Sequence, residues 1–351
     1  DGMAIVNAVV GVVARHEDMW SVFWPSSEVS RLNAAVRDAA RGDGTSRCGA
    51  DSAHGGPGLV VSEETDRLLR DALALAEATG GAFNPLIGPL VAAWDVKAMR
   101  AAYVAGVPLP PAPAADAVEA ASRASSWGLL SRVGEQRWAM GVPAESVGGV
   151  DVASPRLDLG GIAKGYTADA CRDLVVSMGA RGVLVSVGTS SVSVFGTRAD
   201  GSSWRAGLRD PHGGPTSVAG VVELPAGGMS SLSTSGDNLG PLGGVGVGCA
   251  AERAAESTSD RRARETPRET SVGGGRVFDH HIIDPRTGYP AHAGVRQVSV
   301  VASSGVLAEA LSTALLVEPS IDVPDVVARW ARVTGAPASA KVVGLVRAAQ
   351  G

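Results

Sequence analysis

The chain of 351 residues carries 31 Lys and Arg against 36 Asp and Glu, a formal net charge of -5 at pH 7. This balance excludes the basic surface that nucleic-acid binding requires, and the apolar content of 45% is that of a globular protein. Cys48, Cys171 and Cys249 are widely spaced, which indicates neither a zinc site nor a disulfide framework. The apolar stretch 4–14 has about half of the ~20 residues that span a bilayer.

Helices are predicted first along the chain. Apolar residues recur every three or four positions over 4–20, which predicts an amphipathic helix, and Ser26 or Ser27 caps a second short helical turn. The stretch 41–58 is typical of a loop. Residues 62–79 predict a helix that Ser62 caps and that Gly80 and Gly81 end. A proline-rich connector at 106–115 then precedes a short helix at 118–127.

Strands dominate the centre of the sequence. Alternating β-branched residues predict strands at 183–187 and 191–196, and a second hairpin at 204–208 and 217–224. Residues 238–276 are rich in glycine and then in charge without apolar periodicity, so we expect most of them to form a mobile insertion.

The segment "LDLGGIAKGYTADA", 157–170, joins a predicted strand to a helix. Leu157 and Leu159 would point to one side and Asp158 to the other, before a Gly160-Gly161 turn. Lys164 would lie at the start of a helix that buries Ala163, Tyr166, Ala170 and Leu174, where backbone amides favour an anion. The segment is either a plain strand-to-helix corner or a site for a phosphate and a metal.

The segment "LAEALSTALL", 307–316, predicts a helix with Leu307, Leu311, Ala314 and Leu315 on its apolar face. Glu309, Ser312 and Thr313 share the other face, and such oxygen ligands suit a hard cation such as Mg²⁺. The alternative is the ordinary solvent-facing side of an amphipathic helix.

Three turns complete the set of polar motifs. In "HHIIDPRTGYP", 280–290, a histidine ahead of a tight turn at 284–288 is either a base near neutral pH or plain surface polarity. In "TGGAFNPLIGPL", 79–90, the glycines either admit a flat ligand beside Phe83 or end a helix before a proline turn. "LSTSGDN", 232–238, is typical of a turn rich in exposed amides and hydroxyls.

These pieces occur in an order that resembles one family, the FAD:protein FMN transferases or ApbE flavin transferases. The resemblance runs from about residue 15 to 318. It is carried by "WPSSEVSRLN", "GGAFNPLIGPLVAAW", "LDLGGIAKGYTADA", "LVSVGTSS", "STSGDN", "HHIIDPRTGYP" and "VSVVASSGVLAEALSTALLV".

The resemblance implies a Mg²⁺-dependent enzyme that transfers FMN from FAD to a threonine hydroxyl of a target protein, such as a flavin-carrying redox subunit, and releases AMP. It implies one α+β domain over 1–351, with largely antiparallel sheets, flanking helices and the FAD site between two lobes. By the same resemblance His281 is the catalytic base. The resemblance assigns FAD binding to Phe23, Ala82, Phe83, Asn84, Asp158, Lys164 and Ile283. It assigns metal binding to Gly161, Ala163, Glu309, Ser312 and Thr313.

The chain departs from the family pattern at several positions. Glu309 and Asn84 stand where the family usually has Asp, Gly188-Thr189-Ser190 replaces Gly-Gly-Asp, and the first family strand has no counterpart. The alternative functions are therefore an FAD pyrophosphatase that releases FMN and AMP, and a catalytically weakened FAD-binding protein. Family members are often exported and anchored, and we expect any membrane association to need a segment outside this sequence.

Overall fold

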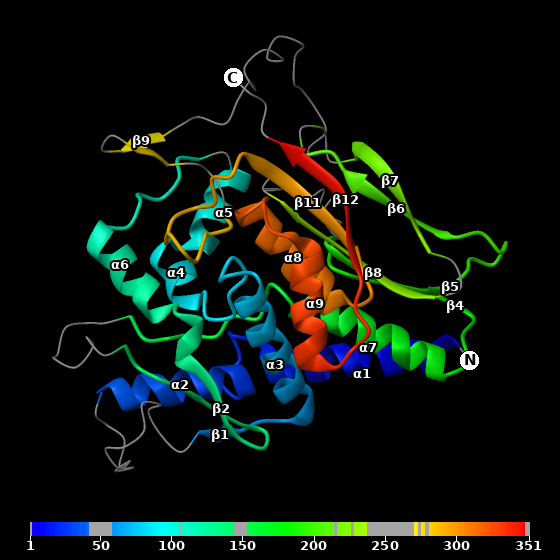
Figure 1. The fold of residues 1–351 in the computed structure, drawn as a ribbon, viewed down its shortest axis with the longest axis horizontal. Helices are drawn as coiled ribbons and strands as arrows, with labels where there is room; N and C mark the ends of the chain where they lie inside the picture. Colours follow the sequence, from blue (N-terminus) through cyan, green and yellow to red (C-terminus); the bar gives the residue numbers. More distant parts are fainter. Residues whose placement is uncertain are drawn as a thin grey trace, which may run out of the picture.

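The structure is a computed structural model that describes residues 2–41, 58–105, 107–143, 153–211, 213, 216–225, 228–236, 270–272, 275–277 and 281–347 (Figure 1). The helices are α1 (Gly2–Trp20), α2 (Glu28–Arg41), α3 (Glu63–Ala78), α4 (Gly88–Ala93), α5 (Val96–Ala105), α6 (Ala115–Ala124), the 3-10 turn η1 (Trp127–Leu129), α7 (Ala163–Ser177), α8 (Gly305–Val317) and α9 (Val323–Thr334). The strands are β1 (Leu59–Val60), β2 (Leu130–Gly134), β3 (Arg137–Met140), β4 (Gly182–Val187), β5 (Ser191–Gly196), β6 (Trp204–Arg209), β7 (Val218–Leu224), β8 (Met229–Gly236), β9 (Thr270–Val272), β10 (Gly275–Val277), β11 (Val295–Ala302) and β12 (Ala340–Arg347).

A five-stranded sheet in the order β12-β11-β8-β5-β4 forms the centre of the fold, and every neighbouring pair in it is antiparallel. Helices α7 and α8 pack on one face (Figure 1). The β6–β7 hairpin covers the other face through Leu208 and Leu224, which meet Val194 and Leu232 of the sheet. Because both faces are covered, β11 is buried along most of its length. This arrangement confirms the predicted α+β class with antiparallel sheets and flanking helices.

The remaining helices build outward from α7 and α8. Helix α1 packs on α7, and α9 packs on α3. The main apolar core joins these helices, with Leu68, Leu75 and Leu311 fully buried. A second apolar cluster lies at α4 and α6, where Leu90 and Val118 contact Ile283. The fold therefore buries Ile283 of the 281–290 turn against a helical layer, while Arg286, Thr287 and Tyr289 stay exposed.

A polar network ties α7 to the sheet. The Asp169 carboxylate accepts hydrogen bonds from the hydroxyls of Ser193 and Ser231, both at 2.6 Å, from Arg172 at 3.0 Å and from the Gly305 amide at 2.6 Å. Buried polar groups need such partners. Asp169 thus connects α7, β5, β8 and the start of α8 at one point.

Most of the predicted elements are confirmed. The helix at 4–20 is α1, the strands at 183–187 and 191–196 are β4 and β5, and the second hairpin is β6–β7. Ser62 caps α3 by accepting from the Thr65 amide, and the chain leaves the helix through Gly80 and Gly81, both with positive φ. Residues 42–57 of the predicted loop, and 238–269 of the predicted insertion, lie outside the described residues, while β9 and β10 pair at the end of that insertion.

Four predictions of local structure are wrong. Residues 157–159, expected to enter the Gly160-Gly161 turn as a strand, form none. Residues 232–236 belong to the central strand β8 rather than to a turn, because their hydroxyls bond beneath α8. Helix α7 buries Gly165, Ala168, Cys171 and Val175, whereas Ala163, Tyr166, Ala170 and Leu174 are only partly buried. The short turn after Ser27 is the 14-residue helix α2.

Candidate functional site

The glycine corner before α7 holds its polar groups in place. Leu157 and Leu159 are buried and Asp158 is half-buried, so the predicted alternation is present although no strand forms. The Asp158 carboxylate accepts from the Gly160 amide at 2.9 Å. Its backbone N–H donates to Pro85 O at 2.9 Å, which joins this corner to the turn after α3.

Helices α7 and α8 touch through glycines. A Cβ atom on Gly165 would lie 2.2 Å from the carbonyl oxygen of Gly305, so only glycine allows this approach. The contact brings Glu309 of α8 to the start of α7, where its Oε2 accepts from the Gly165 amide at 2.7 Å. Glu309 is only 3% exposed, so its carboxylate depends on these partners.

Lys164 completes a small charged cluster. Its Nζ forms an ion pair with Glu309 Oε1 and donates to the carbonyl oxygen of Gly160 at 2.5 Å. One carboxylate oxygen and one backbone carbonyl oxygen therefore converge on a single positive charge. The carbonyl belongs to Gly160, one residue before the segment predicted to hold the metal.

The hydroxyl groups of α8 form hydrogen bonds with strand β8. Ser235 Oγ lies 2.8 Å from Ser312 Oγ and 3.0 Å from Thr313 Oγ1, and Ser312 also donates to the Glu309 carbonyl at 3.0 Å. Ser312 is fully buried and Thr313 is partly exposed. The predicted polar face of this helix is thus turned inward, which excludes the solvent-facing alternative for Glu309 and Ser312.

Ala163 is engaged within α7. Its carbonyl oxygen accepts from the Thr167 hydroxyl at 2.8 Å, which uses the only proton of that hydroxyl. His16 Nδ1 lies 2.9 Å from this Thr167 hydroxyl oxygen. Because the hydroxyl proton is already used, Nδ1 carries a proton and donates it to that oxygen. Burial lowers the pKa of His16, so the neutral Nδ1–H form is favoured.

The turn after α3 is built around Phe83 and Asn84. Ala82 and Phe83 are buried, and a Cβ atom on Gly161 would meet the Phe83 ring at 3.2 Å. The Asn84 amide donates to Ser125 O at 2.6 Å, and its oxygen accepts from the Leu86 amide at 2.8 Å. Helix α3 ends at its C-cap Thr79, and the turn at Asn84 follows. The contact with Gly161 places the Phe83 ring beside the glycine corner, so the turn can end the helix and still present Phe83 to a ligand.

The 281–290 turn begins at half-buried His281. The Gly288 amide donates to Asp284 O at 2.9 Å, as expected for a tight turn. Arg286 donates to both carboxylate oxygens of Asp284 at 3.0 Å and to Glu318, at the end of α8, at 3.2 Å. The turn is therefore tied to the helix that carries Glu309.

Phe23 differs from the other predicted residues. It is 78% exposed, in the connection between α1 and α2, and Lys97 Nζ lies 5.9 Å from its ring centroid. The structure brings Lys164 together with Glu309, and Phe83 together with Gly161. It leaves the Phe23 ring largely in solvent.

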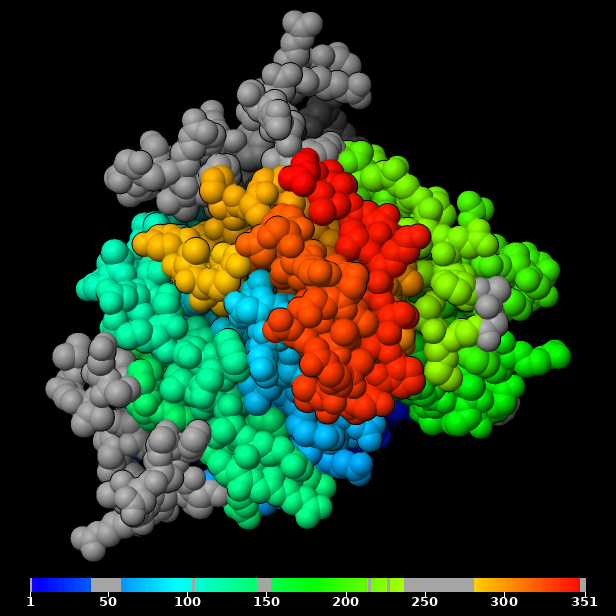
Figure 2. All heavy atoms as spheres, in the orientation of Figure 1, coloured from blue at the N-terminus to red at the C-terminus, as the bar shows by residue number. Residues whose placement is uncertain are grey.

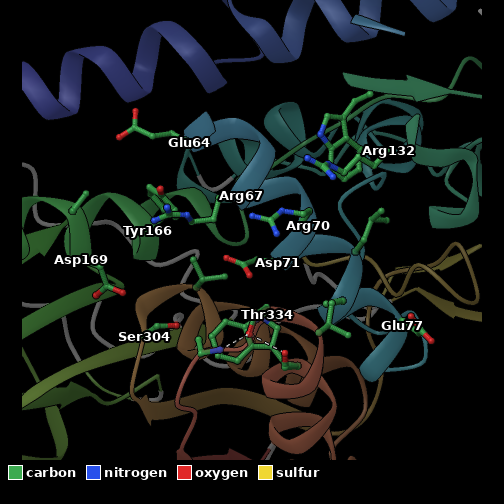
Figure 3. A pocket seen from close by; sticks show the side chains of 18 of the residues that line it. Glu64, Arg67, Arg70, Asp71, Glu77, Arg132, Tyr166, Asp169, Ser304 and Thr334 are labelled. Atoms are coloured by element: carbon green, nitrogen blue, oxygen red, sulfur yellow. Dashed lines mark hydrogen bonds between the residues drawn. The ribbon is translucent and has the colours of Figure 1, made fainter. Parts of the chain in front are cut away.

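A cavity of about 880 Å³ lies elsewhere, along α3 and between α7 and α9 (Figure 3). Among the described residues that line it, none belongs to the predicted site. Figure 3 shows Asp71 between Arg67, Arg70 and the α9 residue Thr334. Burial raises the pKa of Asp71 to about 6, against smaller opposing effects of Arg70, Arg67 and Trp330.

In the space-filling view, α9 and β12 form the surface next to α3 (Figure 2).

No group of three or more His, Cys, Asp or Glu side chains among the described residues is placed to hold a metal. Likewise, none of the described helices is both long enough and apolar enough to cross a bilayer.

Comparison with known proteins gives a consistent picture. A profile of the ApbE family matches residues 3–240 and 268–334. The FAD:protein FMN transferase of Treponema pallidum is 32% identical over 287 residues, which are 80% of this chain and 66% of that protein. The protein of the same name from Rhodobacter capsulatus is 29% identical over 94% of this chain and 49% of its own length. The chain thus spans about half to two thirds of these curated relatives.

Solved structures share the fold. An ApbE protein from Thermotoga maritima superposes with a TM-score of 0.63 at 24% identity, covering 99% of this chain and 90% of that one. The flavinyl transferase ApbE of Pseudomonas stutzeri, in its apo form, gives 0.62 at 23% identity, covering 99% and 85%. At these identities the likeness shows a common fold.

Proposed function

The chain belongs to the ApbE family, and from that premise we propose that it transfers FMN from FAD to a threonine hydroxyl of a target protein and releases AMP. The observation that carries the proposal is the Lys164–Glu309–Gly160 cluster at the start of α7. The cluster lies next to Gly161, against which the Phe83 ring packs. A plain strand-to-helix corner needs neither a buried carboxylate nor a lysine held against it. FAD and a protein acceptor are the partners that the names of the relatives state for those proteins.

The donor atoms suit a hard cation. Carboxylate, carbonyl and hydroxyl oxygens are the ligands that Mg²⁺ takes, and it keeps water or substrate phosphate in its other positions. Here Glu309 and the Gly160 carbonyl already face one positive charge, with Ser312 and Thr313 one helical turn further along α8. These residues, with the predicted backbone of Gly161 and Ala163, would hold the ion. When bound, Mg²⁺ would neutralise charge on the pyrophosphate.

The chain's own residues supply the remaining chemistry. Lys164 places an ammonium at the start of α7, where helix amides also favour an anion. Our candidates for FAD contacts remain Asp158, Ala82, Phe83, Asn84, Ile283 and the exposed Phe23. His281 takes the proton of the acceptor hydroxyl. The acceptor oxygen then bonds to the FMN phosphorus while the bond from that phosphorus to the AMP oxygen breaks, and AMP leaves with the electron pair.

The test is incubation of the purified chain with FAD and a domain that carries an acceptor threonine, with and without Mg²⁺. Intact-mass analysis and an AMP assay should show one FMN added to the acceptor for each AMP released, only with Mg²⁺ and not with His281→Ala. His292→Ala changes an exposed histidine after the same turn and is the matched control. Free FMN and AMP with an unmodified acceptor would instead support the pyrophosphatase, and bound but intact FAD the binding protein.

A further inference from the structure

Lys164 contacts the two oxygens that the proposed function assigns to a divalent cation. Its Nζ contacts Glu309 Oε1 and the carbonyl oxygen of Gly160, the two oxygens that converge at the start of α7. An ammonium group is a compact positive charge with three donors, and a Mg²⁺ ion needs oxygen ligands about 2.0–2.1 Å away. The two cations cannot use the same pair of oxygens at once.

The Glu309 side chain explains why Lys164 is held so closely. One carboxylate oxygen is fixed by the Gly165 amide at 2.7 Å, which leaves the other directed at Lys164. The carboxylate is almost fully buried, and a buried charge needs a partner. Lys164 itself is different, because its side chain is 39% exposed and has an open route to solvent. The lysine can therefore leave, whereas the glutamate cannot.

We propose that Lys164 and the divalent cation compete for Glu309 and Gly160, so that the metal enters by displacing the ammonium group. The inference rests on the proposed function, because the flavin transfer reaction is what calls for the ion. Once displaced, the Lys164 ammonium group would be available to an anionic ligand at the start of α7, where the helix amides also favour an anion.

Metal binding can be measured without any flavin. Mg²⁺ is titrated calorimetrically into the wild-type chain, Lys164→Gln and the control Lys341→Gln, which removes an exposed lysine on β12. Loss of a competitor that is paired with a buried carboxylate should tighten Mg²⁺ binding by about tenfold or more in Lys164→Gln. The control should match the wild type. Equal or weaker binding by Lys164→Gln, or no binding by any of the three proteins, would overturn the inference.

The wild-type chain offers a second measurement, which does not depend on the variant folding. It has only three lysines, Lys97, Lys164 and Lys341, and the first and last are exposed. Reductive methylation followed by peptide mass analysis should show Lys164 reacting faster when Mg²⁺ is added, with the other two unchanged. An unchanged rate at Lys164 under saturating Mg²⁺ would contradict displacement. The flavin transfer assay is independent, so FMN transfer with no competition would refute this inference and leave the proposed function standing.

Discussion

Asp71 gives the sharpest prediction about stability. It lies on α3 in the cavity against α9, and burial raises its pKa from 3.8 to about 6. Because the folded protein holds this proton more tightly than the unfolded chain, the group favours folding below pH 4 and opposes it as the pH rises through about 6. A shift of about two units corresponds to about 3 kcal/mol, since each unit is worth about 1.4 kcal/mol. Asp71→Asn keeps the shape and removes the charge.

The variant should therefore be more stable than the wild type by up to about 3 kcal/mol at pH 8, and by only about 1 kcal/mol at pH 4.5, which is closer to the unfolded pKa. Loss of the weaker attraction to Arg70 and Arg67 reduces this gain. Urea denaturation followed by tryptophan fluorescence at both pH values measures the difference, with Glu77→Gln as a control that removes an exposed carboxylate from the same helix. A gain that does not depend on pH, or a loss of stability at pH 8, would refute the reasoning.

Three further substitutions test the packing around the site. Asp169→Ala removes the acceptor of four hydrogen bonds and leaves the buried Arg172 with Asp173 as its remaining carboxylate partner, so thermal or urea unfolding should show a loss of about 3–5 kcal/mol from the groups left unsatisfied. Gly165→Ala inserts a methyl group where α7 crosses α8 and should lower the free energy of unfolding by at least about 1–3 kcal/mol. The control Gly11→Ala, in open space on α1, should gain about 0.5–1 kcal/mol. Asn84→Asp cannot donate to Ser125 O, and circular dichroism melts should show a loss of about 1–3 kcal/mol at pH 7.

Periodicity predicted the elements whose environment is simple. Helix α3 buries one apolar face, and β4 to β7 show the alternation or β-branched content that identifies strands. Helix α1 forms where the apolar spacing predicts it, but Val6 and Val10 of that apolar stripe are exposed. Helix α7 violates this rule, because it is covered by α1, by α8 and by the sheet. Close backbone contact buries Gly165, and the Asp169 network buries Arg172, although neither residue is apolar. Apolar spacing alone therefore selected the wrong face.

The turn predicted at 232–238, where strand β8 lies, was wrong for a related reason. Its serines are polar in the sequence but are buried, and Ser231, Ser233 and Ser235 bond to Asp169 and to the hydroxyls of α8. A run of serine, threonine and glycine normally indicates a turn. Only the tertiary partners, which lie more than sixty residues away, make this run suitable for the centre of a sheet.

The candidate site could be predicted as a set of residues but not as a set of contacts. The resemblance named Glu309 and Lys164 separately, and the sequence gives no sign that they form an ion pair, because the pair depends on two glycines, Gly165 and Gly305, that let α7 and α8 touch. The side chain at 309 must reach both the Gly165 amide and Lys164, and a glutamate does so here. Asn84 likewise makes one donor and one acceptor contact, of which a carboxylate could make only the acceptor contact. These two departures from the family pattern, at positions 309 and 84, are therefore matched by the surrounding hydrogen bonds of this chain.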